Sequence, residues 1–90
     1  MSAFSAFELK PGLYRVKVAF TDHYGTVHPV GESWSYESHS FVPYHGGLTL
    51  NIVDANGPRC IYLQDYAETQ GEIVNNFSNY VEELKPPVLP

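Results

Sequence analysis

The sequence predicts a mainly β domain with one C-terminal helix, arranged as a small, bent antiparallel barrel of the SH3 type. Three observations lead to this fold class: apolar and polar residues alternate in several short runs, glycine and proline clusters separate these runs, and the apolar spacing changes to three and four residues near the C-terminus. Alternation is typical of half-buried strands, whereas spacing of three and four is typical of an amphipathic helix. An open antiparallel sheet packed by the helix is the alternative, because both architectures require the same alternation.

The first two strands are predicted on either side of a hairpin turn. A Lys-Pro-Gly turn at residues 10–12 precedes a strand over residues 13–21, in which every second side chain is apolar or aromatic. Asp-His-Tyr-Gly at residues 22–25 has the composition of a hairpin turn, and the second strand begins at Thr26. The Pro-Val-Gly segment at residues 29–31 interrupts this strand, which favours an edge position or a bulge.

Three further strands follow, separated by turns at residues 43–47 and 54–58. The first of them covers residues 32–42, where aromatic side chains alternate with serines. A single alternation phase predicts that one set of residues faces the core: Val16, Val18, Phe20, Trp34, Tyr36, Leu48, Leu50 and Ile52. Ile61 and Leu63 continue the pattern in the last strand.

The helix is predicted from about Thr69 to Leu84, with its start within residues 65–71. Thr69 and Glu72 match a capping box, and one apolar stripe follows. The stripe comprises Ile73, Phe77, Tyr80, Val81 and Leu84.

The length of 90 residues allows one small domain over residues 1–90. Residues 1–8 and 85–90 are predicted to be flexible ends, the latter because three prolines in six residues forbid a helix.

Composition and charge exclude several classes of partner. Ten acidic residues against five basic ones give a net charge of −5, which repels nucleic acid and anionic membranes. The longest apolar runs are far below the roughly 20 residues that a membrane-spanning helix requires. Cys60 is the single cysteine, which favours a reducing compartment over a disulfide-stapled scaffold, so we expect a cytoplasmic protein.

No pattern of residues indicates catalysis, a cofactor or a metal site. Four histidines lie near Asp22, Glu32 and Glu37, but none has a recognised ligand spacing. The chain lacks a nucleophile elbow and a phosphate-binding glycine loop, and a domain of this size has little volume for an enclosed pocket. We therefore predict no enzyme activity and no cofactor. The alternative is a small metal-binding or metal-dependent hydrolytic protein that uses the histidines.

Tyrosines near turns favour a binding function. Tyr24 and Tyr44 belong to the two turns richest in aromatic and imidazole groups, and loops on a rigid scaffold often carry binding residues. The predicted function is a non-catalytic protein-binding module, with Tyr24, Glu32, Tyr44 and His45 as binding residues. The acidic balance favours a basic protein partner, and a homodimer is left open.

The stretch from Leu9 to Leu50 resembles a family of short, uncharacterised bacterial domains of unknown function. The motifs that carry this resemblance are the Gly-Glu-x-Trp element at residues 31–34 and the Pro-Tyr turn at residues 43–44. The resemblance implies a freestanding bacterial protein and transfers no catalytic role.

Overall fold

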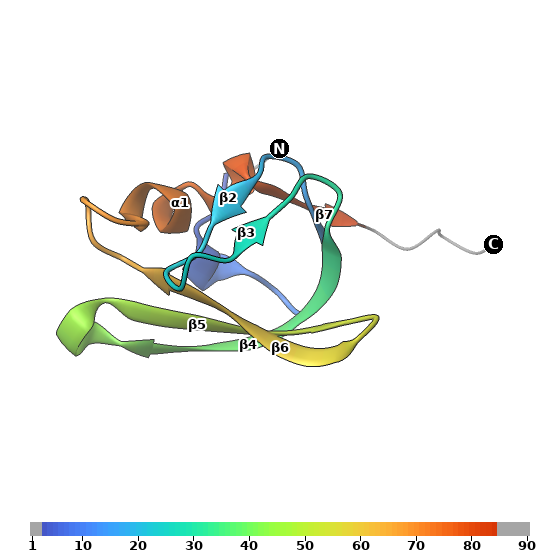
Figure 1. Cartoon of the computed structure of the whole chain (residues 1–90), viewed down its shortest axis with the longest axis horizontal. Helices are drawn as coiled ribbons and strands as arrows, with labels where there is room; N and C mark the ends of the chain where they lie inside the picture. Colours follow the sequence, from blue (N-terminus) through green and yellow to red (C-terminus); the bar gives the residue numbers. More distant parts are fainter. Residues whose placement is uncertain (1–2, 85–90) are drawn as a thin grey trace.

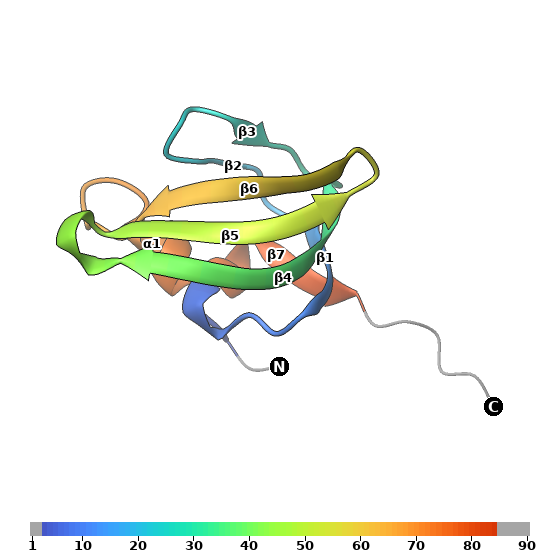
Figure 2. The ribbon, with the colours of Figure 1, turned by 90° about the horizontal axis from the view of Figure 1, so that it is seen from below.

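The computed structural model describes residues 3–84, and its largest element is a five-stranded antiparallel sheet with the strand order β6-β5-β4-β1-β7 (Figures 1 and 2). Its strands are β1 (Gly12–Val16), β4 (Ser33–Val42), β5 (Gly47–Asp54), β6 (Gly57–Gln64) and β7 (Val81–Leu84). A separate hairpin pairs β2 (Phe20–Thr21) with β3 (Val27–His28). The prediction of a mainly β, antiparallel fold is confirmed.

The five strands do not close on themselves, because β6 and β7 are the two edges of the sheet. The SH3-like barrel is therefore not confirmed. The sheet is nevertheless irregular, since the β4–β5 register shifts between Tyr36 and Ser38. Such a bulge bends a strand and increases its twist. Helical turns and the β2–β3 hairpin lie on the same side of the β4–β5–β6 layer (Figure 1).

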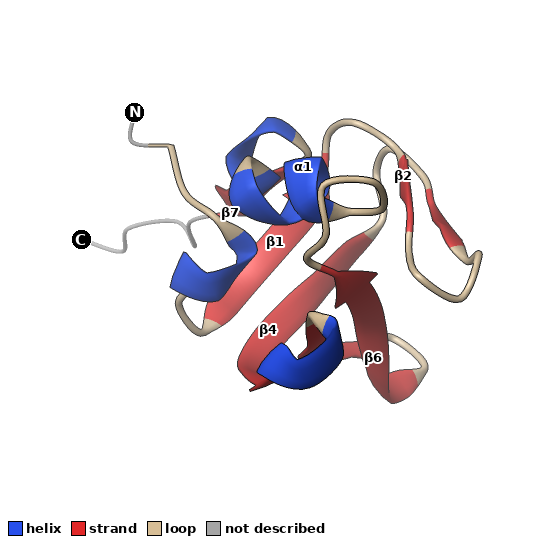
Figure 3. Ribbon diagram, turned by 90° about the vertical axis from the view of Figure 1, so that its left-hand side faces the viewer, coloured by secondary structure: helices blue, strands red, loops and turns tan. Residues whose placement is uncertain are grey.

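The C-terminal helix predicted over residues 69–84 is wrong in extent. Helix α1 covers only Gly71–Asn75, a 3₁₀ turn η3 follows at Phe77–Asn79, and the chain then pairs with β1 as strand β7. The Asn-rich segment explains the break, because Asn75 and Asn76 donate side-chain hydrogen bonds to the carbonyls of Gly71 and Glu72 and so compete with a continued helix. Helix α1 contacts η3, the strand β6 and a 3₁₀ turn at Ala6–Glu8, and Figure 3 shows the short helical segments in blue beside the red strands.

The core lies between the sheet and these helical turns. Buried apolar side chains comprise Ala6, Leu9, Tyr14, Val16, Phe20, Trp34, Tyr36, Leu48, Leu50, Ile52, Ile61, Leu63, Val74, Phe77 and Val81. The inward-facing residues predicted for β4, β5 and β6 are thus confirmed. The single strand predicted over residues 13–21 is interrupted after Val16, because the backbone amides of Lys17 and Val18 both donate to Tyr80. This interruption leaves Val18 exposed, so the inward position predicted for it is wrong.

The N-terminal segment, which we expected within a flexible end, contains a 3₁₀ turn η1 at Ala6–Glu8 with Ala6 buried. The Phe4 amide also donates to Ser78 Oγ at 3.1 Å. The predicted flexible end at residues 85–90 lies outside the described residues.

A further turn, η2, covers Pro43–His45. Within residues 3–84, no helix is long and apolar enough to cross a membrane.

Candidate functional site: a buried charge network and a tyrosine surface

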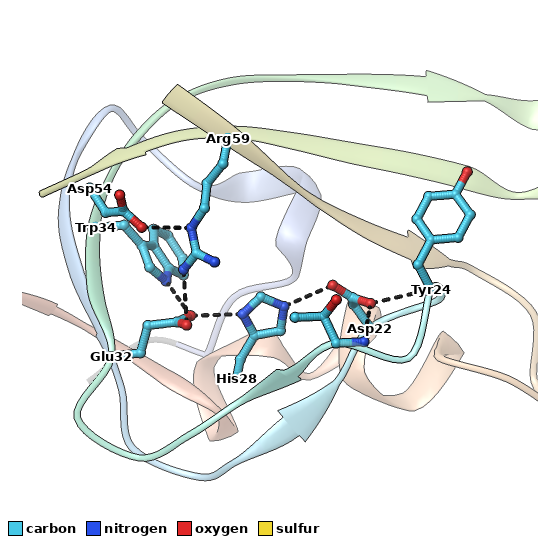
Figure 4. A network of polar contacts seen from close by, with 8 residues as sticks. Asp22, Tyr24, His28, Glu32, Trp34, Asp54 and Arg59 are labelled. Atoms are coloured by element: carbon cyan, nitrogen blue, oxygen red, sulfur yellow. Dashed lines mark hydrogen bonds and ion pairs between the residues drawn. The ribbon is translucent and has the colours of Figure 1, made fainter. Parts of the chain in front are cut away.

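His28 lies between two carboxylates in the interior (Figure 4). Its side chain is 1% exposed, its Nδ1 lies 2.7 Å from Glu32 Oε2, and its Nε2 lies 2.9 Å from Asp22 Oδ2. An ionised carboxylate can only accept hydrogen bonds, so both ring nitrogens must donate and the ring is an imidazolium while both carboxylates are ionised. Neither nitrogen then offers a lone pair to a substrate proton or to a metal ion.

Glu32 joins His28 to the sheet. Trp34 Nε1 donates to Glu32 Oε2 at 3.1 Å, and Arg59 Nη2 lies 2.9 Å from Glu32 Oε1. Arg59 Nε is also 2.7 Å from Asp54 Oδ2, as an ion pair whose angle does not make it a hydrogen bond. We call Asp22, His28, Glu32, Trp34, Asp54 and Arg59 the charge network.

The charges of this network stabilise one another despite their burial. Burial acts to raise the pKa of Glu32, but hydrogen bonds and attraction from Arg59 and His28 outweigh it and hold the pKa below its usual range. Burial acts to lower the pKa of Arg59, but Glu32 and Asp54 raise it above its ordinary value. Glu32 and Arg59 are therefore both charged at neutral pH.

At its other end the network fixes the β2–β3 turn. Asp22 Oδ1 accepts the backbone N–H groups of Tyr24 and Thr26, each at 3.0 Å. Gly25 completes the turn with a φ of 83°, a conformation that favours glycine. The buried carboxylate of Asp22, held by His28, thus determines where the Tyr24 backbone lies.

The four binding residues predicted from the sequence fall into two places. Tyr24 and His45 line one shallow hollow of about 200 Å³. Tyr44 adjoins it, with its ring centroid 6.2 Å from that of His45. Glu32 lies away from the hollow, in the charge network, where it supports the Tyr24 turn through His28 and Asp22.

Tyr62 on β6 completes the exposed aromatic group. Its ring packs edge to face on that of Tyr24 with centroids 4.7 Å apart, and it lines the same hollow. Tyr24 is 71% exposed and Tyr44 is 85% exposed. We call Tyr24, Tyr44, His45 and Tyr62 the tyrosine surface.

Sequence reasoning missed the charge network. It found only that the histidines lack a recognised ligand spacing, whereas His28 is buried and stacks on Phe20 with centroids 4.8 Å apart. The local signal was that Asp22 continues the inward alternation of Phe20, so a polar residue was being buried. Arg59 gave no such signal, because its partners come from other elements.

The histidines do not gather into a metal centre in the part of the chain that the structure describes. No group of three or more His, Cys, Asp or Glu side chains among residues 3–84 is placed to hold a metal ion. The alternative function, which relied on such a group, therefore finds no ligand set there.

Comparison with known proteins agrees with this picture of a small β-rich domain. The family model described as a domain of unknown function, DUF3601, matches residues 3–86. The chain belongs to the DUF3601 family. The resemblance inferred from residues 9–50 is thereby confirmed, and the DUF3601 match extends it over nearly the whole chain.

One solved structure is similar to this DUF3601 domain along almost all of its length. It is an integron cassette protein from the mobile metagenome of Vibrio cholerae, 30% identical, with a TM-score of 0.83. The match covers 91% of this chain and 93% of the cassette protein. No curated protein gives a significant match.

Proposed function

We propose that this DUF3601 chain is a non-catalytic protein-binding module and that it engages its partner through the tyrosine surface. The observation that carries the proposal is the exposure of Tyr24 and Tyr44 on two turns of a rigid scaffold. Tyrosine combines an apolar ring with a polar tip and is enriched in protein interfaces. Because the charge network holds the Tyr24 turn, little conformational entropy is lost there when a partner binds.

The chemistry near this surface favours binding over catalysis. His23 and His45 line the hollow, but no described carboxylate or nucleophile forms a hydrogen bond with either ring. His28 has the carboxylates that a general base requires, yet both its nitrogens are occupied and its side chain is buried. Neither His28 nor the two histidines at the hollow therefore has the arrangement of partners expected of a general acid or base.

The partner that fits the charge of the chain is a basic protein. A net charge of −5 attracts a basic partner at long range and raises the rate of association more than the affinity. The compartment that we propose is the cytoplasm, because Cys60, the single cysteine, is a free thiol. The open sheet is sufficient for this role, and an SH3-like closure is not required.

Site-directed photo-crosslinking in bacterial cells tests the proposal. A benzophenone amino acid in place of Tyr24 or of Tyr44 should crosslink the same basic protein. The same group in place of Val30, 65% exposed on the turn at the other end of the hairpin, should not. Adding Tyr62→Ala to the Tyr44 crosslinker should reduce the product. Absence of a shared product at positions 24 and 44, or equal capture at position 30, contradicts the proposed surface.

A further inference from the structure

The tyrosine surface contains no carboxylate, lysine or arginine, although the chain carries a net charge of −5. The same is true of all the residues that line its hollow of about 200 Å³. Tyr14, Tyr36 and Tyr80 use their hydroxyls in hydrogen bonds within the fold, whereas the hydroxyls of Tyr24 and Tyr44 have no such partner among residues 3–84. The surface therefore offers aromatic rings and free O–H donors to a ligand.

The strand edge beside this surface is already paired. Tyr62 lies on the edge strand β6, and its carbonyl accepts the His23 amide at 2.7 Å. The hairpin thus covers the sheet edge at this point, so recognition here depends on side chains. A suitable ligand has rings that pack on tyrosine and carbonyls that accept O–H bonds, and it needs no partner for backbone N–H groups. Proline-rich segments have these properties, and they dock on aromatic-lined grooves as a polyproline II helix.

The chain itself contains such a sequence directly after β7. Residues 85–90 read Lys-Pro-Pro-Val-Leu-Pro, so Pro87 and Pro90 are three residues apart. One turn of a polyproline II helix takes three residues, and a docked segment of this sequence would present both rings on one side. The sequence thus supplies the ring spacing that an aromatic surface recognises.

The charge of this segment fits the rim of the hollow. Lys85 is the one charged residue of the segment. Asp65 lies at the rim, since its amide donates to the Gly46 carbonyl at 2.8 Å and the preceding residue, Gln64, lines the hollow. The Asp65 carboxylate accepts a hydrogen bond from Asn75 but forms no ion pair within residues 3–84. Opposite charges at a rim orient a ligand and raise its association rate more than its affinity.

The segment is too short to place its prolines on the hollow of its own chain. Through successive pairs across the sheet, Leu84 stands level with Pro58 on β6, four strands away. With about 4.8 Å between strands and about 3.3 Å per residue, Leu84 and Tyr62 lie roughly 23 Å apart along the sheet. Figure 2 shows the end of β7 and the turn after β4 at opposite ends of the molecule. The three residues from Lys85 to Pro87 span only about 9 Å as polyproline II.

We infer that residues 85–90 of a second copy occupy the tyrosine surface. The two proline rings pack on Tyr24 and Tyr62, and the lysine of the segment meets the carboxylate of Asp65 at the rim. The two chains contribute different surfaces, so the contact is head-to-tail and links copies without a two-fold axis. The inference rests on the surface of the proposed function but not on its basic partner, and a protein that binds there competes with the segment.

An NMR titration of two complementary variants tests this contact between copies. The observed chain is ¹⁵N-labelled and carries Pro87→Ala and Pro90→Ala, so it keeps the surface but loses the segment. The unlabelled chain carries Tyr24→Ala and Tyr62→Ala, so it keeps the segment but loses the surface. The amide signals of the residues that line the hollow should shift as the unlabelled chain is added. An unlabelled chain with all four substitutions should need roughly tenfold more protein for the same shift.

A synthetic Lys-Pro-Pro-Val-Leu-Pro peptide provides a second measurement, which needs no substitution of the tyrosines. Added to the same labelled chain, it should shift the same amide signals, whereas Lys-Ala-Ala-Val-Leu-Ala should not. The inference is overturned if neither the chain nor the proline peptide shifts these signals, or if the alanine peptide shifts them equally. Photo-crosslinking from position 24 to a basic protein can still succeed in that case. If the peptide binds and no basic protein is crosslinked, the proposed function alone fails.

Discussion

Replacing His28 by leucine isolates the contribution of the charge network to stability. The substitution retains an apolar body against Phe20 but removes the hydrogen bonds of 2.7 Å and 2.9 Å to Glu32 and Asp22. Removing one partner of a buried pair typically costs about 3–5 kcal/mol, because the remaining charge is left uncompensated. Glu32 keeps Arg59 and Asp22 keeps two backbone donors, so we expect the lower end, about 3 kcal/mol.

Urea denaturation followed by the fluorescence of Trp34 measures this loss. A thermal melt provides a second measurement. For a domain of this size, a loss of 1 kcal/mol in the free energy of unfolding lowers the melting temperature by roughly 4–8 °C, so His28→Leu should lower it by at least about 12 °C. The control is Arg15→Ala, which removes an exposed ion pair of 2.9 Å with Glu82 and should cost no more than about 1 kcal/mol. If His28→Leu costs no more than Arg15→Ala, the network does not stabilise the fold and the reasoning is refuted.

Three further predictions concern acid stability, the core and the tyrosine surface. The pKa of Glu32 is lower in the folded chain than the 4.5 of a free glutamate, so its stabilising contribution is complete above pH 4.5 and is lost as the pH falls through the folded value. Urea midpoints from pH 7 to pH 3 should decline less steeply in Glu32→Gln. Phe77→Ala, at a fully buried position beside Phe20, should cost about 3–5 kcal/mol in a thermal melt. Tyr44→Ala should change stability by no more than about 0.5 kcal/mol, because that side chain is exposed, and a larger loss would make it a structural residue.

The strand phases could be predicted because alternation is a local property of the sequence. Trp34 and Tyr36 on β4, and Leu48 and Leu50 on β5, are buried as their spacing indicates. The same kind of evidence misled at the C-terminus. The predicted stripe ran from Ile73 through Phe77 to Val81 at separations that match a helix, although the chain changes to a strand after Phe77. In α1 the fully buried side chain is that of Val74 and not that of Ile73. The need to bury these side chains determines their spacing in the sequence. Pairing with β1, which is distant in sequence, determines that residues 81–84 form a strand.

The residues of the tyrosine surface could be predicted from the sequence only where glycines and prolines indicate an exposed turn. Tyr24, Tyr44 and His45 lie on or beside turns whose glycines and prolines mark them in the sequence, and the structure gathers them at one end. Glu32 lies apart from the other three predicted residues, in the charge network, where it contacts His28 four residues before it and Arg59 on β6. Most contacts of the charge network join residues two to six positions apart, but polar contacts across turns follow no strand or helix period, and Arg59 meets Glu32 only in the folded chain.

Burying the charges of this network costs free energy, and the position of the network shows what it contributes in return. Apolar side chains of similar volume often give equal or greater stability than a buried ion pair, so stability alone does not account for His28 and its carboxylates. The hairpin that they hold has strands of only two residues each, and an isolated two-stranded hairpin is at best marginally stable in water. Hydrogen bonds from Tyr24, Thr26 and His28 to the Asp22 carboxylate fix the turn itself. The contacts of Glu32 with His28 and with Arg59 on β6 then fix the hairpin at one angle to the sheet. Apolar packing lacks this directionality, so the network specifies the orientation of the turn that presents Tyr24.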